Sequence, residues 1–126
     1  MKQEIKTTLA PAALGPYSQA TRMGSWLFVS GQTPLDPETM VVVGETAAEQ
    51  AHRCLQNLLA IVAAAGLGPE SVMKTTVYLK DMNDFAAVNA VYAEYFAQPY
   101  PARACVQVAR LPKDALVEID AIASAN

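Results

Sequence analysis

Apolar positions change their spacing along the chain, and each spacing predicts a different element. Residues 25–32 (S-W-L-F-V-S-G-Q) are aromatic and β-branched and stop before Pro34, which is typical of a strand. Residues 46–66 repeat apolar side chains at helical spacing, with Thr46 and Glu49 forming a capping box and Gly66 marking the end. A second helical stripe over residues 84–97 ends before Pro99.

The remaining segments complete an alternation of strands and helices. Strands are expected at residues 3–8, 72–80, 103–109 and 115–123, with a short return strand at 40–43 and a shaped loop at 9–17. The order β-β-α-β-α-β-β, without repeats or linkers, predicts one α+β domain over residues 1–126. We expect a mixed sheet with both helices packed on one of its faces.

The sheet face opposite the helices is also expected to be buried, because its strands carry apolar side chains. Strands 25–32 and 115–123 carry apolar side chains in both registers, whereas the solvated face of a monomer is normally polar. The charged fraction is 17%, below the roughly 25% usual for soluble domains. Two interpretations fit: a buried interface between subunits, or a surface rich in alanine.

Charge and side-chain inventory exclude several function classes. The net charge of −3, without a basic stripe, argues against nucleic acid as a partner. No apolar run approaches the roughly 18 residues of a membrane span, and the start lacks a signal-like apolar segment, so we expect a cytoplasmic protein. Cys54 and Cys105 are far apart and His52 is the one histidine, so neither a disulfide framework nor a metal site is expected.

The last two strands predict a polar cluster. If residues 110–113 form a hairpin loop, Cys105 lies opposite Glu118 and Arg103 opposite Asp120. Alternation then places Arg103, Cys105, Gln107, Glu118 and Asp120 on one face, and Val106, Val108, Val117, Ile119 and Ala121 on the helix-packed face. The cluster is either a cross-strand Arg103–Asp120 salt bridge or a site in which Arg103 captures a small carboxylate and Glu118 orients water.

Other residues allow both a structural and a functional interpretation. Asn89 lies inside the apolar stripe of the second helix, so its amide either bonds a neighbouring group or faces a pocket. Tyr17, after Gly15-Pro16, suits a lid as well as simple packing, and Ser30-Gly31 indicates either a bulge or the close approach of another group. Cys54 is expected in the core and His52 on the helix surface.

The sequence resembles the reactive intermediate deaminase A family, also called the YjgF/YER057c/UK114 or L-PSP family. The resemblance covers essentially the whole chain. Its motifs are P-A-R-A-C-V-Q-V-A-R-L at 101–111 followed by V-E-I at 117–119, G-P-Y-S-Q at 15–19, V-S-G-Q at 29–32, D-P-E-T at 36–39 and D-F-A-x-V-N-x-V-Y-x-x-Y-F at 84–96. One departure is Met40, which stands where the family usually has glycine after the D-P-x-T turn.

The resemblance implies a chorismate-mutase-like fold and a homotrimer with a central barrel and three sites between subunits. It implies hydrolysis of enamine/imine intermediates such as 2-iminobutanoate and 2-iminopropanoate, released by pyridoxal-phosphate enzymes, to 2-keto acids and ammonia without a cofactor. Arg103 would hold the substrate carboxylate, and Glu118, with the backbone of Cys105, would position water. Tyr17, Ser30, Gly31 and Asn89 would line the same cleft.

Two other functions remain open alongside the deaminase. A regulatory module would bind 2-keto acids through Arg103 without turnover. An endoribonuclease or translation inhibitor is also associated with the family, and the acidic pI near 5.0 disfavours it.

Overall fold

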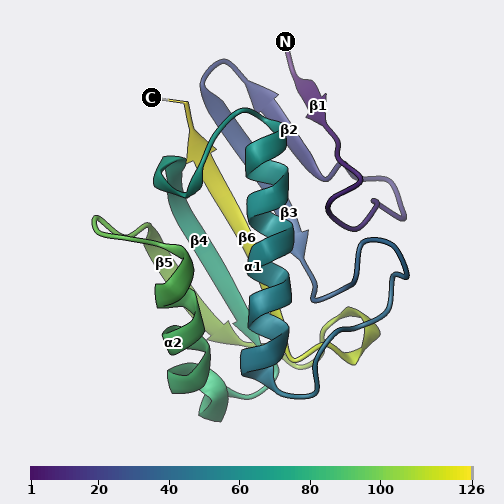
Figure 1. Cartoon of the computed structure of the whole chain (residues 1–126), viewed down its shortest axis with the longest axis vertical. Coiled ribbons are helices and arrows are strands. Elements are labelled where there is room, and N and C mark those ends of the chain that lie inside the picture. Colours follow the sequence, from purple (N-terminus) through teal and green to yellow (C-terminus); the bar gives the residue numbers. More distant parts are fainter. Residues whose placement is uncertain (126) are drawn as a thin grey trace.

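The computed structural model describes residues 1–125 and has a six-stranded sheet with both helices on one face (Figure 1). The strands are β1 (Gln3–Ile5), β2 (Ala20–Met23), β3 (Trp26–Gln32), β4 (Val72–Leu79), β5 (Ala102–Gln107) and β6 (Val117–Ser124), and the helices are α1 (Ala47–Ala64) and α2 (Phe85–Tyr95). Short 3-10 turns lie at Pro69–Ser71, Met82–Asp84 and Pro112–Asp114. This arrangement confirms the predicted α+β fold class.

Helix α1 forms as its sequence predicts. The Thr46 side chain accepts a hydrogen bond from the Glu49 backbone at 3.2 Å, and the Glu49 carboxylate accepts one from the Thr46 backbone at 3.0 Å. This capping box satisfies N–H groups that the first helical turn leaves unpaired. Leu55, Leu58 and Val62 are fully buried against the sheet, and Cys54 lies in the core as expected.

The sheet has the order β1-β2-β3-β6-β4-β5, and all neighbouring strands are antiparallel except β4 and β5. Helix α2 makes the crossover between these two parallel strands (Figure 1). Strand β2 was not predicted. The predicted strand at 40–43 is wrong: the segment makes one isolated bridge, between Leu35 and Val42, and the Asp36 carboxylate accepts hydrogen bonds from two backbone N–H groups, which holds a tight turn.

The predicted hairpin of the last two strands is also wrong. Strand β4 lies between β5 and β6, and it pairs Thr75 with Arg103 and Val77 with Cys105. Thr75 and Val77 are buried on the helix side, so the side chains opposite them face the same way. Arg103, Cys105 and Gln107 therefore lie on the helix side of the sheet, whereas Glu118 and Asp120 point to the other face.

The predicted core face is confirmed on β6 but not on β5. Val117, Ile119 and Ala121 are buried as predicted, but Val106 belongs to the open face and is 41% exposed. The open face also carries Trp26 and Phe28, each about half exposed. The helix-free face of the single chain thus exposes large apolar side chains beside Glu118 and Asp120, in agreement with the apolar residues found in both registers of its strands.

Candidate active site

Arg103 is held in place by α2. Its Nη1 donates a hydrogen bond to the Asn89 Oδ1 at 2.7 Å. The guanidinium carbon lies 4.9 Å from the ring centre of Tyr92 and 5.6 Å from that of Phe85. These three α2 residues follow the i, i+4, i+7 spacing of one helix face, so the helix presents an amide and two aromatic rings to one cation. The amide of Asn89 thus finds its partner within the site.

The guanidinium borders open space and has no acidic partner in the described chain. A cavity of about 420 Å³ beside it is lined by Asn89, Tyr92, Ala93, Tyr100, Pro101 and Arg103. The ion pairs within residues 1–125 are His52–Glu94 and Arg110–Asp114. The predicted Arg103–Asp120 salt bridge is therefore wrong: Asp120 lies across the sheet and accepts hydrogen bonds from Tyr78 at 2.9 Å and the Thr76 backbone at 3.1 Å.

Cys105 follows Arg103 on the same face of β5, at the free edge of the sheet. Burial against the core raises the pKa of its thiol, and the nearby Arg103 only partly opposes this shift. The thiol therefore stays protonated at neutral pH. The Val108 N–H donates to Leu79 on β4, so alternation along the strand turns the backbone N–H and C=O of Cys105 away from β4, toward the open edge. The backbone of Cys105 is thus better placed for ligand contact than its sulfur.

Glu118 lies at the start of β6 on the opposite face and packs on Gly31. A Cβ at position 31 would overlap the Glu118 Oε2, so only glycine leaves room for this carboxylate. The pairing of β3 with β6 shifts register between Val29 and Gln32, which places Ser30 and Gly31 in a bulge. Both sequence interpretations of Ser30-Gly31, the bulge and the close approach, therefore apply.

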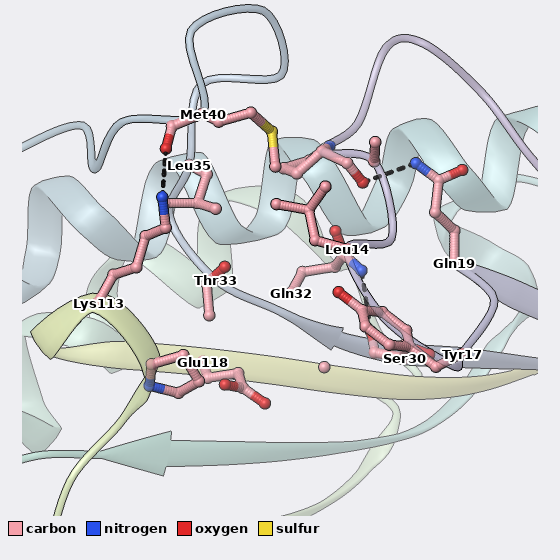
Figure 2. A pocket seen from close by; sticks show the side chains of 14 residues that line it. Leu14, Tyr17, Gln19, Ser30, Gln32, Thr33, Leu35, Met40, Lys113 and Glu118 are labelled. Carbon is pink, nitrogen blue, oxygen red and sulfur yellow. Dashed lines mark hydrogen bonds between the residues drawn. The ribbon is translucent and has the colours of Figure 1, made fainter.

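The Glu118 carboxylate is half-buried, and burial raises its pKa, with a further contribution from the negative charge of Asp120. No hydrogen bond from residues 1–125 counters this shift. The carboxylate faces a cavity of about 490 Å³, shown in Figure 2. The cavity is lined by Pro11, Ala12, Leu14, Tyr17, Gln19, Ser30, Gly31, Gln32, Thr33, Leu35, Met40, Pro112, Lys113 and Glu118.

The loop that carries Tyr17 is fixed by a buried amide. Gln19 donates hydrogen bonds to the carbonyl oxygens of Thr7, Ala10 and Pro11 at 2.8 to 3.2 Å and accepts one from the Thr7 backbone. The Ser30 hydroxyl donates to the Ser18 carbonyl at 2.6 Å, which ties this loop to β3. Sequence reasoning missed Gln19, because the backbone groups that its amide bonds lie 8 to 12 residues away in the sequence.

Lys113 is the second residue that the sequence did not single out. Its Nζ donates to the Met40 carbonyl at 2.9 Å, and both residues line the Glu118 cavity (Figure 2). Lys113 and Asp114 both adopt positive φ angles, 56° and 55°, in the turn before β6. No local sequence pattern predicts two left-handed non-glycine residues in succession.

The candidate residues fall into two separate groups within one chain. Arg103, Cys105 and Asn89 form the arginine half, on the helix side of the sheet; Glu118, Tyr17, Ser30 and Gly31 form the glutamate half, on the other side. Strands β5 and β6 are separated by β4, a spacing of roughly 9 to 10 Å, with side chains in opposite directions. The predicted single cluster is therefore wrong: within one chain, the two halves lie on opposite faces of the sheet and border separate cavities.

The remaining features concern metal-ligating clusters, His52 and helices that could span a membrane. Residues 1–125 contain no group of three or more His, Cys, Asp or Glu side chains placed to hold a metal ion. His52 lies on the surface of α1, where its Nδ1 bonds the Tyr95 hydroxyl at 2.8 Å. No helix of this part of the chain is both long and apolar enough to cross a membrane.

Comparison with known proteins identifies relatives along the full length. The family model described as Endoribonuclease L-PSP matches residues 7–125. A RutC family protein from Synechocystis sp. is 58% identical over 94% of this chain and 93% of its own length. The 2-iminobutanoate/2-iminopropanoate deaminase of Salmonella typhimurium is 52% identical over 98% of both chains. The crystal structure of E. coli TdcF with bound serine superposes with a TM-score of 0.92 at 47% identity, covering 98% of this chain and 99% of that one. Sequence motifs, fold and relatives agree, and the chain belongs to the L-PSP family.

Proposed function

We propose that this protein hydrolyses small 2-imino acids, such as 2-iminobutanoate and 2-iminopropanoate, to 2-oxo acids and ammonia. The observation that carries the proposal is Arg103, a guanidinium oriented by Asn89, Tyr92 and Phe85 beside an open cavity and without an acidic partner in residues 1–125. Such a fixed planar fork suits bidentate binding of a small carboxylate. The deaminase names of relatives about half identical to this chain support the same assignment.

The complete site forms between two copies of the chain. Arg103 of one copy and Glu118 of the next meet only across an interface, because each chain holds them on opposite faces of its sheet. The exposed Trp26, Phe28 and Val106 on the open face favour such an association, since burying them removes apolar surface from water. We expect the homotrimer implied by the resemblance, with three equivalent sites.

The chemistry is a hydration followed by loss of ammonia. Arg103 holds the substrate carboxylate, so that C2 of the imine faces the Glu118 carboxylate of the neighbouring copy. This Glu118 and the outward backbone of Cys105 position the attacking water. Glu118 accepts a proton from water as the water oxygen bonds to C2, and passes that proton to the imine nitrogen, which gives a carbinolamine. Glu118 then takes the proton of the new hydroxyl and passes it to the nitrogen, so that the C=O bond forms as the C–N bond breaks and ammonia leaves. The raised pKa of Glu118 makes it a stronger base than an exposed carboxylate. This hydrolysis needs neither metal nor cofactor.

The test is the rate of 2-oxo acid formation from an imine that an amino-acid oxidase generates in situ, with semicarbazide competing for the imine. Wild type should accelerate hydrolysis, and Arg103→Ala should lose roughly a hundredfold or more in kcat/KM because the carboxylate anchor is gone. Arg110→Ala is the matched control: it removes an exposed arginine of the same segment that lines neither cavity, and it should keep wild-type activity.

The assay also separates the proposal from its alternatives. Full imine hydrolysis by Arg103→Ala would contradict the assigned role. Tight binding of 2-oxo acids without turnover would instead select the regulatory module. The name of the matched family model makes RNA cleavage the remaining alternative; cleavage that persists through purification and disappears in Arg103 or Glu118 variants would replace the deaminase assignment.

A further inference from the structure

Met40 occupies an unusual backbone position beside the Glu118 cavity. Its φ is 61°, in the left-handed region where a Cβ is unfavourable and glycine is not. The turn is held by main-chain atoms: the Met40 N–H donates to Asp36 at 2.8 Å, and its carbonyl accepts from Lys113 at 2.9 Å. Glycine would make both hydrogen bonds equally well, so the turn itself does not require this side chain.

The side chain instead contributes to the cavity. Met40 is half-buried and lines the space that Glu118 faces. Figure 2 shows its side chain crossing the cavity wall opposite Glu118, from the end near Lys113 toward the end near Leu14 and Gln19. Leu14 and Leu35 line the same space, so apolar side chains lie across from the carboxylate, with the Lys113 ammonium at one end (Figure 2). A thioether on an unbranched chain adapts its shape to differing apolar groups.

We propose that Met40 determines specificity by forming, opposite Glu118, the apolar wall against which the substrate's own side chain packs. This inference rests on the proposed function, and it names the substrate class: 2-imino acids with larger apolar side chains, such as those derived from leucine and methionine, in preference to the alanine-derived imine. The carboxylate and imine groups are common to all of these substrates. Discrimination therefore comes from apolar contact, which one added methylene changes by about tenfold or more.

The experiment measures one ratio, kcat/KM for the leucine-derived imine over kcat/KM for the alanine-derived imine. Met40→Ala and Met40→Gly should each lower this ratio by about tenfold, with little change in the rate for the alanine-derived imine. Val41→Ala is the matched control, because Val41 is the exposed neighbour of Met40 in the same loop and does not line the cavity. It should leave the ratio unchanged.

The same two variants test the backbone argument. Both lose the thioether, but only Met40→Ala keeps a Cβ in the left-handed region, so Met40→Gly should melt higher than Met40→Ala by roughly 3 to 5 °C. This order reverses the usual one, in which alanine is the more stable. A higher melting temperature for Met40→Ala would show that the position is unstrained and overturn this premise.

The remaining outcomes separate the inference from the function on which it rests. An unchanged or increased substrate ratio in both Met40 variants, with an active wild type, would overturn the role of Met40 and leave the deaminase assignment intact. A wild type without turnover would overturn the assignment; the ratio of affinities for 4-methyl-2-oxopentanoate and pyruvate, measured by calorimetry, then decides the role of Met40. Absence of both turnover and binding would overturn both proposals.

Discussion

The arginine half and the glutamate half of the site are built in opposite ways. Arg103 lies on a strand against a helix, with a 2.7 Å hydrogen bond to Asn89 and two aromatic rings beneath the cation. Glu118 lies against a bulge and two loops, and no hydrogen bond from residues 1–125 lowers its pKa. The Arg103 guanidinium is thus oriented in advance, whereas the charge of the Glu118 carboxylate is poorly stabilised by its surroundings.

This difference fits two separate tasks, the binding of an anion and the transfer of a proton. A group that binds an anion performs best when it is already oriented, because binding then costs little conformational entropy. A group that moves a proton performs best when neither protonation state is strongly favoured near the working pH. Under the proposed function, the arginine half binds the substrate and the glutamate half transfers the proton, and three predictions test this division of roles.

The largest expected effect comes from mixing two inactive variants. Arg103→Ala and Glu118→Gln should each be nearly inactive alone, but random exchange of their subunits leaves about a quarter of the interfaces with both native residues, one half from each neighbour. Activity should therefore rise from near zero to about a quarter of wild type after co-refolding, measured with the imine assay. A mixture that stays inactive, while native size and circular dichroism are regained, would contradict a site shared between copies.

A smaller effect should follow from Gly31→Ala. The added Cβ must displace the Glu118 carboxylate, which is the flexible end of a side chain, so the fold should tolerate the change while catalysis should not. Misplacing a catalytic group by about 1 Å costs roughly a hundredfold in rate, and we expect a loss of that order in kcat/KM.

A glycine outside this contact serves as the control. A Cβ at Gly15 would lie 3.6 Å from the Tyr17 ring, an ordinary contact, so Gly15→Ala should change activity little. Binding of a 2-oxo acid should persist in Gly31→Ala, because the arginine half is untouched. Activity within twofold of wild type would mean that the close packing of Glu118 on residue 31 has no role in catalysis.

Local patterns predicted the helices and most strands, because their signals lie within a few residues. The capping box of Thr46 and the stripe of α2 are of this kind, and both are present. The pairing of strands was not predictable in this way. Strands β5 and β6 are neighbours in sequence, and a short connection normally makes a hairpin; here β4 inserts between them because α2 returns β5 parallel to β4.

The wrong pairing of β5 with β6 also gave a wrong arrangement of the candidate site residues. A different neighbour shifts the register, and a shift of one residue turns every side chain of a strand to the other face. The predicted hairpin placed Arg103 and Cys105 on the same face as Glu118, whereas the structure places them on the face that α2 covers. The identity of the candidate residues came from the resemblance and from residue chemistry, but their division into two halves needed the three-dimensional sheet. The anchoring amide of Gln19 likewise depends on contacts 8 to 12 residues away, which no short window reveals.

The smallest predicted effect concerns pH and tests the poor stabilisation of the Glu118 charge. Because the folded-state pKa of Glu118 is raised, the folded protein holds this proton more tightly than the unfolded chain, and the free energy of unfolding falls as pH rises above about 4.5. Glu118→Gln lacks this ionisation. Relative to wild type it should gain stability between pH 4 and pH 7, by no more than about 3 °C in Tm at fixed protein concentration.

Asp36→Asn is the control of opposite sign: backbone hydrogen bonds lower the pKa of Asp36, so the ionised form contributes stability that is present at pH 7 and lost only as pH falls below about 3.8. A Glu118→Gln curve parallel to that of wild type would mean that the glutamate half stabilises its charge as well as the arginine half does, and the division of tasks between the halves would lose its electrostatic basis.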